Sequence, residues 1–275
     1  MVKKSALSSS PLLIDFAGVT LVRGDKTVSR DLTLQIARGE HVAILGPNGS
    51  GKSTLIKAIT REIYPLDRGA RMRFQVLGLD DWDIGDLRHH LGIVTLDLLH
   101  HLSHEVTLRQ VTARELVLSG HFNSVGLWPH HRPTAPQEKA ARRILRFLEI
   151  SHLANRPVSA MSSGEQRRCL IGRALAHNPE ALILDEPTNS LDPGAVREFR
   201  QLLRKLARAG RGVLLVTHHI ADVIPEIDRV IMIKSGRIVA DGAKTALLTS
   251  ARLSKLFGTK LRVSKSRGCY DVAAD

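Results

Sequence analysis

A glycine-rich run at residues 46–54 reads GPNGSGKST and stands between an apolar stretch, HVAIL, and the helical pattern LIKAITREI. Glycines let the backbone turn tightly, so that N–H groups converge on one point, and a helix beginning there adds the positive end of its dipole. The run fits the pattern G-x-x-x-x-G-K-[ST] in the strand–loop–helix context that a phosphate-binding loop requires. An ordinary glycine-rich turn is the alternative, and the complete pattern makes it the weaker interpretation.

Two side chains of this run have chemical roles in a phosphate-binding loop. Lys52 would place a positive charge at the β- and γ-phosphates of a nucleotide, and the Ser53 hydroxyl would ligate Mg²⁺. We therefore expect ATP and Mg²⁺ as cofactors. The nucleotide-binding residues predicted by the run are Gly46, Pro47, Asn48, Gly49, Ser50, Gly51, Lys52, Ser53 and Thr54.

A second motif, ALILDEP at residues 181–187, runs from apolar residues directly into Asp185 and Glu186. Successive side chains of a strand point to opposite sides, so the two carboxylates can take different tasks. Asp185 would hold Mg²⁺, usually through water, and Glu186 would act as general base toward the attacking water. Two adjacent acidic residues alone indicate nothing, but the apolar strand and the upstream phosphate loop make this pair specific.

The order of segments predicts an α/β protein with a largely parallel sheet, because strand-like and helix-like stretches alternate. EALILD and GVLLVTHH read as buried strands, and RVIMIKSGRIVADG as a hairpin turning at Ser235-Gly236. From about 97 to 178 the pattern is mainly helical, as in EVTLRQVTARELVLSG and PQEKAARRILRFLEI. We expect this part to be a helical lobe inserted into one α/β core.

The composition indicates the cellular compartment in which the protein is expected. The sequence is 43% hydrophobic, yet no apolar run approaches the eighteen or more residues of a membrane span. The start, MVKKSALSSSPLL, lacks the apolar core of a signal peptide, and two cysteines cannot form a disulfide framework. We therefore expect the protein in the cytoplasm, either free or peripheral on the inner face of the cell membrane.

A third motif, MSSGEQRRCLIGRAL, precedes the ALILDEP strand and begins as a helix with Glu165 in its first turn. At this point the chain resembles the ATP-binding cassette (ABC) family, whose members carry an LSGGQ-type signature here. This sequence reads MSSGE, with Met161 in place of Leu and Ser163 in place of the first Gly. A helix N-terminus with a serine hydroxyl can still meet phosphate. The resemblance covers about residues 12–245.

The resemblance implies the fold of a P-loop NTPase core with an ABC-type antiparallel β subdomain and an inserted helical lobe. Residues 1–245 would form the nucleotide-binding domain, with the lobe at about 97–178. Residues 246–275 resemble the tail of metal-chelate importer ATPases, a short helix followed by a small hairpin. A generic helical end is the alternative.

The resemblance also gives roles to residues outside the first two motifs. NSLD at residues 189–192 is similar to the family's D-loop and adds Asp192 to the nucleotide site. VTHH supplies the family's switch histidine at His218, which contacts the γ-phosphate in this family, while His219 is a neighbour without a role. The family's adenine-stacking aromatic falls on Arg23. Its guanidinium plane either stacks on a base or is an ordinary surface group.

In this family the active unit is a head-to-tail pair of cassettes with two ATP molecules between them, each phosphate loop facing the partner's signature. Because the sequence holds one cassette, we expect an ATP-dependent homodimer that hydrolyses ATP. The residues assigned in this way to the nucleotide of the other protomer are Ser162, Ser163, Gly164 and Glu165. The catalytic residues are then Lys52, Glu186 and His218.

Two functions compete on these grounds. The first is the ATPase subunit of an importer for a metal, oxyanion or chelate, similar to the molybdate-associated and metal-chelate subgroup and needing separate membrane permease subunits. The second is a stand-alone cytosolic ATPase acting on RNA or the ribosome, which the net charge of +13 favours. The basic residues are spread along the chain, however, as on a solvated surface. A regulatory module with little turnover is weaker still, because Glu186 and His218 are present.

Residues 91–98, LGIVTLDL, depart most from the family pattern. The family's Q-loop places a Gln at the end of this strand, where it reaches Mg²⁺ and the attacking water, and here Leu96 stands in that place. Asp97 substitutes only if the register slips by one residue. Three histidines follow, His100, His101 and His104, and exposed loop histidines are favoured over a metal site because no further ligand set completes it.

Replacing Leu96 by Gln tests this departure. We expect ATPase turnover in Leu96→Gln to rise severalfold, because an amide would position Mg²⁺ and water where leucine does neither. Steady-state phosphate release with saturating ATP and Mg²⁺ measures the change. An unchanged or lower turnover would show that residue 96 does not occupy the Gln position, or that another residue already does its work.

Overall fold

The central strand of the fold is β3 (His41–Leu45), which leads directly into the glycine-rich run. The computed structural model describes residues 11–66, 72–95 and 110–274. These residues form two compact units. The first combines the chain up to Leu87 with the chain from Gly212 onward, and the second is Arg88–Arg211.

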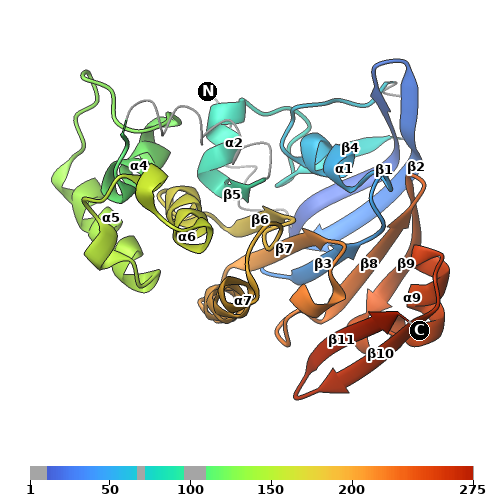
Figure 1. The fold of residues 1–275 in the computed structure, drawn as a ribbon. Coiled ribbons are helices and arrows are strands. Elements are labelled where there is room, and N and C mark those ends of the chain that lie inside the picture. Colours follow the sequence, from blue (N-terminus) through green and yellow to red (C-terminus); the bar gives the residue numbers. More distant parts are fainter. Residues whose placement is uncertain (1–10, 67–71, 96–109, 275) are drawn as a thin grey trace. The chain divides into compact units, whose positions relative to one another are not determined.

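In the first unit β3 lies between β7 (Gly212–Thr217) and β8 (Arg229–Lys234), parallel to both, and β9 (Arg237–Ala243) pairs antiparallel with β8. Figure 1 shows blue β3 between the two orange strands. Every residue of β7 is buried, as expected of a parallel strand covered on both faces. The hairpin predicted at Ser235-Gly236 is present, since β8 ends at Lys234 and β9 begins at Arg237.

A second, antiparallel sheet of this unit has the order β2 (Lys26–Ala37), β1 (Leu12–Arg23), β4 (Arg73–Val76). Phe16 and Phe74 stack across β1 and β4 with ring centroids 4.6 Å apart. Arg61, which follows α1 (Lys52–Ile59), is 1% exposed, with its guanidinium 4.0 Å from the Phe74 ring centroid. Its Nη2 donates to the carbonyls of Phe74 (2.9 Å) and Leu79 (3.0 Å), so this buried charge is held by backbone oxygens.

The chain after β9 continues in the first unit as α8 (Lys244–Leu247), α9 (Ser250–Phe257) and the antiparallel hairpin β10 (Leu261–Ser266) and β11 (Cys269–Ala274). Strand β11 packs near the short helix η4 (Ile220–Asp222). A separate C-terminal extension beginning at residue 246 stays a prediction, as do the other domain boundaries.

The second unit contains the parallel pair β5 (Leu91–Val94) and β6 (Ala181–Asp185), with α2 (Ile84–His90) leading into β5. Its other elements are mainly helical. They are α4 (Ala113–Ser119), η1 (Gly120–Phe122), α5 (Ala135–Phe147), η2 (Ser151–Leu153), η3 (Val158–Ala160), α6 (Ser163–Ala174) and α7 (Pro193–Arg208). Within the described ranges, no helix is both long and apolar enough to cross a membrane.

One predicted helix has a well-defined start. The run EVTLRQVTARELVLSG was predicted to be mainly helical, and its described part becomes helical at Ala113. Gln110 has a φ of 51°, in the left-handed region that a helix does not use. Thr112 and Glu115 form a capping box, and this box fixes the helix start.

The β8–β9 turn lies directly against β2. Gly236, at the second position of the turn, has a φ of 73°, and a Cβ at this residue would stand 1.7 Å from the carbonyl oxygen of Val28. Glycine is therefore required twice at this position, for its backbone conformation and for the close approach of a neighbouring strand.

The substitution Gly236→Ala should lower the free energy of unfolding by about 3 kcal/mol, because backbone atoms must move apart to admit the methyl group. Gly210→Ala is the matched control, since Gly210 has a φ of 82° with nothing within 4 Å of an added Cβ. It should cost only about 1 kcal/mol of left-handed strain. Chemical denaturation of both variants measures the difference, and equal losses would show that the contact with β2 is unimportant.

Candidate functional site

The glycine-rich run forms a loop that ends at the start of α1. Gly49 and Gly51 have φ values of 74° and 104°, which L-residues with side chains rarely adopt. Gly51 is the N-cap of α1, and no side chain accepts a hydrogen bond from the first turn. The dipole of the helix favours negative charge at such a start, so this end of α1 suits an anion.

Lys52 belongs to the loop as much as to the helix. It is 6% exposed, and its Nζ donates to the carbonyls of Gly46 (2.8 Å) and Pro47 (3.2 Å). Gly46 has no room for a side chain, because a Cβ would lie 2.3 Å from the carbonyl oxygen of Ile233. Ser53 is exposed in the first turn of α1. An ammonium group and a hydroxyl thus stand at the helix start, and this pair suits a nucleoside triphosphate bound with Mg²⁺.

A short relay of hydrogen bonds fixes this loop from outside. The Ser29 hydroxyl on β2 donates to the Gly236 carbonyl (2.6 Å), and the Gly236 N–H donates to the Ser50 carbonyl (2.8 Å). Ser29 and Ser50 are both buried. Sequence reasoning missed Ser29 altogether, since a lone serine in a strand pattern carries no signal. The turn at Gly236 was visible, but its contact with the loop was not.

His218 lies at the same sheet edge as the loop. Strands β3 and β7 are parallel neighbours with Leu45 opposite Thr217, so the residues that follow them, Gly46 and His218, are adjacent at the carboxyl edge. The backbone after His218 is fixed, since the His219 N–H donates to the buried Thr217 hydroxyl (3.0 Å). His218 is half-buried and His219 is exposed. The role of His218 at a γ-phosphate stays a prediction.

Arg23 stands at the end of β1, where the hairpin turns into β2. Its side chain is exposed, and the next residue, Gly24, has a φ of 58°. Stacking on a base stays a prediction.

In the second unit, Asp185 and Glu186 stand at the carboxyl end of β6, each 7% exposed. Glu186 has a φ of 47°, a left-handed conformation that costs a non-glycine residue about 1 kcal/mol or more. It directly precedes Pro187, which itself restricts the residue before it. The Asn189 N–H donates to the Glu186 carbonyl (3.2 Å) and closes this turn. The residue predicted as the general base thus has a strained backbone.

The signature forms the start of α6. The Ser162 hydroxyl accepts from the Glu165 N–H (3.3 Å) while a Glu165 carboxylate oxygen accepts from the Ser162 N–H (2.8 Å), a capping box. The hydrogen bond from the Ser162 backbone lowers the pKa of Glu165. Ser162 and Ser163 are exposed. Gly164 packs against α7, since a Cβ added at this glycine would lie 3.3 Å from the Cβ of Ala195. The family resemblance predicts that these residues lie near a phosphate group. Glu165 would bring a negative charge to that position.

The D-loop residues connect to α6 and α7. Asp192 is the N-cap of α7 and accepts from the Ala195 N–H (3.0 Å), so it has a structural task besides any contact with nucleotide. Arg167 on α6 is buried and donates from Nη2 to the Asn189 carbonyl (3.1 Å). Burial lowers the pKa of Arg167 to about 10. Sequence reasoning did not identify Arg167, because only tertiary contact joins it to the D-loop.

The structure thus brings the predicted residues together in two groups. Loop residues 46–54 and His218 share an edge of the first unit, while Asp185, Glu186, Asp192 and the signature belong to the second. Leu96, Asp97 and the three histidines His100, His101 and His104 lie outside the described residues. Predictions on these five residues remain predictions.

Comparison with known proteins finds similar proteins over most of the chain. Residues 29–189 match the family model described as ABC transporter. The Nod factor export ATP-binding protein I of Rhizobium johnstonii is 35% identical over 242 residues, 88% of this chain and 72% of the relative. The phosphonates import ATP-binding protein PhnC 1 of Rhodopseudomonas palustris is 30% identical over 239 residues, 86% of this chain and 82% of the relative.

Two solved structures support the same fold. An ATP-binding cassette of an ABC transporter in its ADP conformation has a TM-score of 0.74 at 24% identity, over 90% of this chain and 98% of that chain. A bacterial ABC transporter cassette solved as a dimer has a TM-score of 0.64 at 28% identity, over 84% and 98%. The α/β class with an antiparallel β subdomain is therefore confirmed.

Removing the Ser29 hydroxyl should loosen the phosphate loop. We expect Ser29→Ala to lower the free energy of unfolding by about 1–3 kcal/mol and to speed amide hydrogen exchange at Gly236, because the Gly236 carbonyl loses its buried donor. Thr33→Ala on the same strand is the control, since the Thr33 hydroxyl accepts only an exposed bond from the Gly18 N–H (3.3 Å). Unchanged exchange at Gly236 in Ser29→Ala would contradict the relay.

Proposed function

The chain belongs to the ABC transporter family, and from this premise we propose that it binds and hydrolyses ATP to drive a transporter whose membrane subunits are separate chains. The observation that carries the proposal is the phosphate loop of the first unit. Its uncapped helix start, its buried Lys52 and the neighbouring His218 supply donors and positive charge at one sheet edge.

The proposed chemistry divides the work among five side chains. Lys52 would bind the β- and γ-phosphates, and His218 would hold the γ-phosphate from the adjacent strand. The Ser53 hydroxyl and the Asp185 carboxylate would hold Mg²⁺, which when bound neutralises charge that develops on the phosphate oxygens. Glu186 would orient the attacking water and accept its proton.

We further propose that two copies of the chain enclose two ATP molecules. In this arrangement the start of α6 in one protomer covers the phosphate loop of the other, as the helix start at Ser162 suits an anion. The likeness to a cassette solved as a dimer supports the arrangement. Glu165 counts against tight closure, because its carboxylate would repel a γ-phosphate. Its bond to the Ser162 N–H keeps the charge turned toward the chain's own backbone.

For the direction of transport, we propose uptake of a small solute such as an oxyanion, a metal or a chelate. One relative is named for phosphonate import, which fits an oxyanion, and another for Nod factor export. Co-purification with a permease from solubilised membranes would support the transporter role. A salt-sensitive shift of RNA instead would favour a stand-alone ATPase acting on RNA.

Two substitutions test hydrolysis and the dimer together. Lys52→Ala should abolish ATP binding, and Glu186→Gln should keep binding but lower turnover by about 10²–10⁴-fold, because the general base is lost. With ATP and Mg²⁺, Glu186→Gln should be dimeric in light scattering, and with ADP it should be monomeric. Lys57→Ala, on the half-buried face of the same helix, should behave as wild type. A Glu186→Gln variant that stays monomeric with ATP would rule out the proposed dimer.

A further inference from the structure

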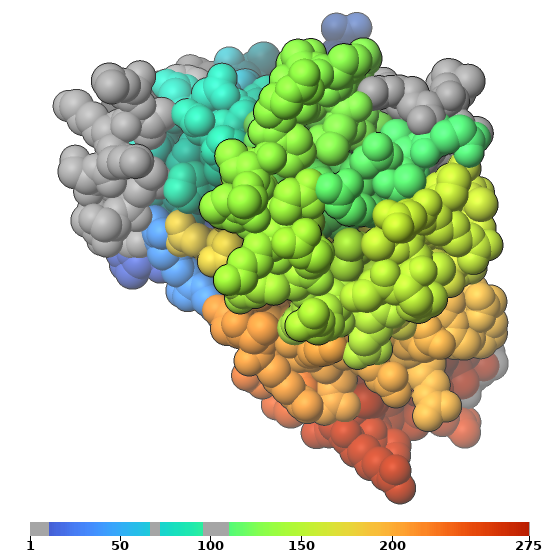
Figure 2. Space-filling view, turned by 90° about the vertical axis from the view of Figure 1, so that its left-hand side faces the viewer, coloured from blue at the N-terminus to red at the C-terminus, as the bar shows by residue number. Residues whose placement is uncertain are grey.

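A cavity of about 750 Å³ lies in the second unit, away from every residue assigned above. One wall is a single face of α5, with Ala140, Ile144 and Phe147, and another is the end of α6 at Leu175. Figure 2 shows the side of this unit where the green segments, including the α4–α5 region, reach the surface. The volume of the cavity falls in the range of pockets that bind drug-sized ligands.

The charged lining of the cavity is of one sign. Arg143 and Arg146 of α5, Lys205 of α7 and Arg211 line it, and none of its described lining residues is acidic. A hollow of about 450 Å³ beside it shares Lys205 and adds Arg204 and Arg208. The field inside the cavity therefore favours an anion.

The four basic residues of the larger cavity differ in the hydrogen bonds that they already make. Lys205 Nζ donates to the Phe147 carbonyl (2.7 Å) and to Glu149 (2.9 Å), and so caps the end of α5. Arg211 donates from Nη2 to the Asn178 side chain (2.7 Å), while its buried Nε has no hydrogen-bond partner. Arg143 and Arg146 are exposed and make no hydrogen bond or ion pair with any residue that the structure describes. Two guanidinium groups and one buried N–H thus remain available.

The α5 wall of the cavity is partly apolar. Ile144 and Phe147 lie three residues apart on one face of α5, and both are half-buried, so they still present surface to the cavity. Lys205 Nζ stands 4.7 Å from the Phe147 ring centroid, which leaves this aromatic ring at the boundary between apolar and charged surface. A ligand that fits both parts has an apolar, planar body and a negatively charged head.

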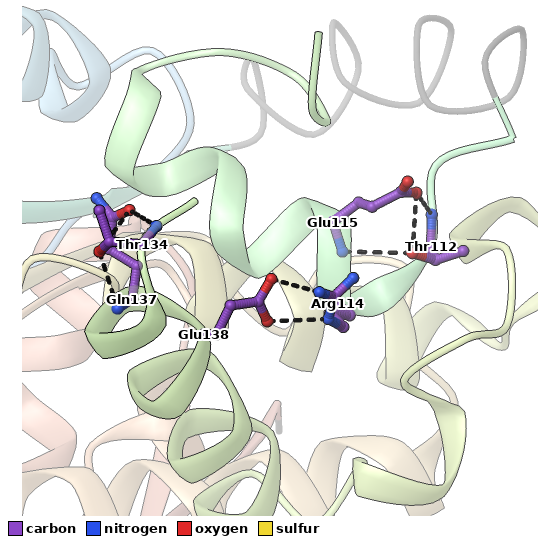
Figure 3. Close-up of polar contacts among 6 residues, drawn as sticks. All are labelled: Thr112, Arg114, Glu115, Thr134, Gln137 and Glu138. Carbon is purple, nitrogen blue, oxygen red and sulfur yellow. Dashed lines mark hydrogen bonds and ion pairs between the residues drawn. The ribbon is translucent and has the colours of Figure 1, made fainter. Parts of the chain in front are cut away.

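The α5 wall is held in place before any ligand arrives. Figure 3 shows Arg114 of α4 and Glu138 of α5 pointing toward each other, and Arg114 Nε donates to Glu138 at 3.1 Å. Thr134 and Gln137 form a capping box at the start of α5, with the Thr134 N–H donating to Gln137 at 2.8 Å. A wall fixed in this way lowers the cost of ordering on binding.

We propose that this cavity binds a small organic anion whose phosphate or carboxylate head pairs with Arg143, Arg146 and Arg211 and whose planar body rests on Ile144 and Phe147. Guanidinium groups are suited to such heads because their fork of N–H donors matches two anionic oxygens. The site is independent of the phosphate loop, so the inference holds whether or not the chain is an ATPase.

The probe is 1-naphthyl phosphate, which combines a planar apolar body with a phosphate head. We expect saturable binding to the full-length Lys52→Ala protein in fluorescence titration, at least tenfold tighter than inorganic phosphate or neutral 1-naphthol measured by competition. Lys52→Ala is used so that binding at the nucleotide site does not contribute. 1-Naphthoic acid in the same titration distinguishes a carboxylate head from a phosphate head.

A pair of neighbouring variants gives the control. Adding Arg143→Gln should weaken binding by about tenfold or more, which is the size expected for losing one charge-assisted contact. Adding Arg142→Gln should leave binding unchanged, because Arg142 is exposed on the same helix but does not line the cavity. Equal weakening in both variants, or no saturable binding by the naphthyl anions, would overturn the proposal. Binding of an RNA oligonucleotide without binding of these probes would also overturn it.

Discussion

The position of the phosphate loop depends on the relay from Ser29 through Gly236 to Ser50. A glycine-rich loop has many accessible conformations, and an anion site is effective only when its donors already converge. The relay supplies that order from two elements distant in sequence, a strand of the antiparallel sheet and the β8–β9 turn. The antiparallel sheet therefore supports the proposed nucleotide site, although none of the residues expected to bind phosphate belongs to it.

Local sequence signals predicted local structure well. The phosphate loop, the Ser235-Gly236 hairpin and the helix start at Ser162 each depend on a few neighbouring residues, so their patterns carry the answer. The run EVTLRQVTARELVLSG was predicted to be mainly helical, and the capping box of Thr112 and Glu115 sets the start of the helix in its described part. Contacts such as Arg167 with the D-loop join residues 22 positions apart, and no periodicity encodes them. The roles assigned from family resemblance stay predictions.

The basic residues that give the chain its net charge of +13 do not all have the same function. Part of it is used inside the protein, since Arg61, Arg167 and Arg173 donate to backbone carbonyls from buried or half-buried positions. Burial also lowers the pKa of Arg173 to about 10. Such arginines are structural, and they add to the formal charge without adding a binding surface. Arg143 and Arg146, by contrast, are exposed and have no such task. Total charge is therefore a poor guide to partners, and the engagement of each cation is a better one.

The left-handed backbone of Glu186 limits which sequences this position can explore over evolutionary time. Two requirements fall on the same residue, the carboxylate of the proposed general base and a φ of 47° ahead of a proline. Gly, Asn and Asp satisfy the second requirement best, while β-branched residues fail it. A duplicated copy of this gene released from selection for the proposed hydrolysis would thus gain stability by replacing Glu186 with Gly or Asn. Gly or Asn at this position of a descendant cassette would then mark the loss of the proposed general base.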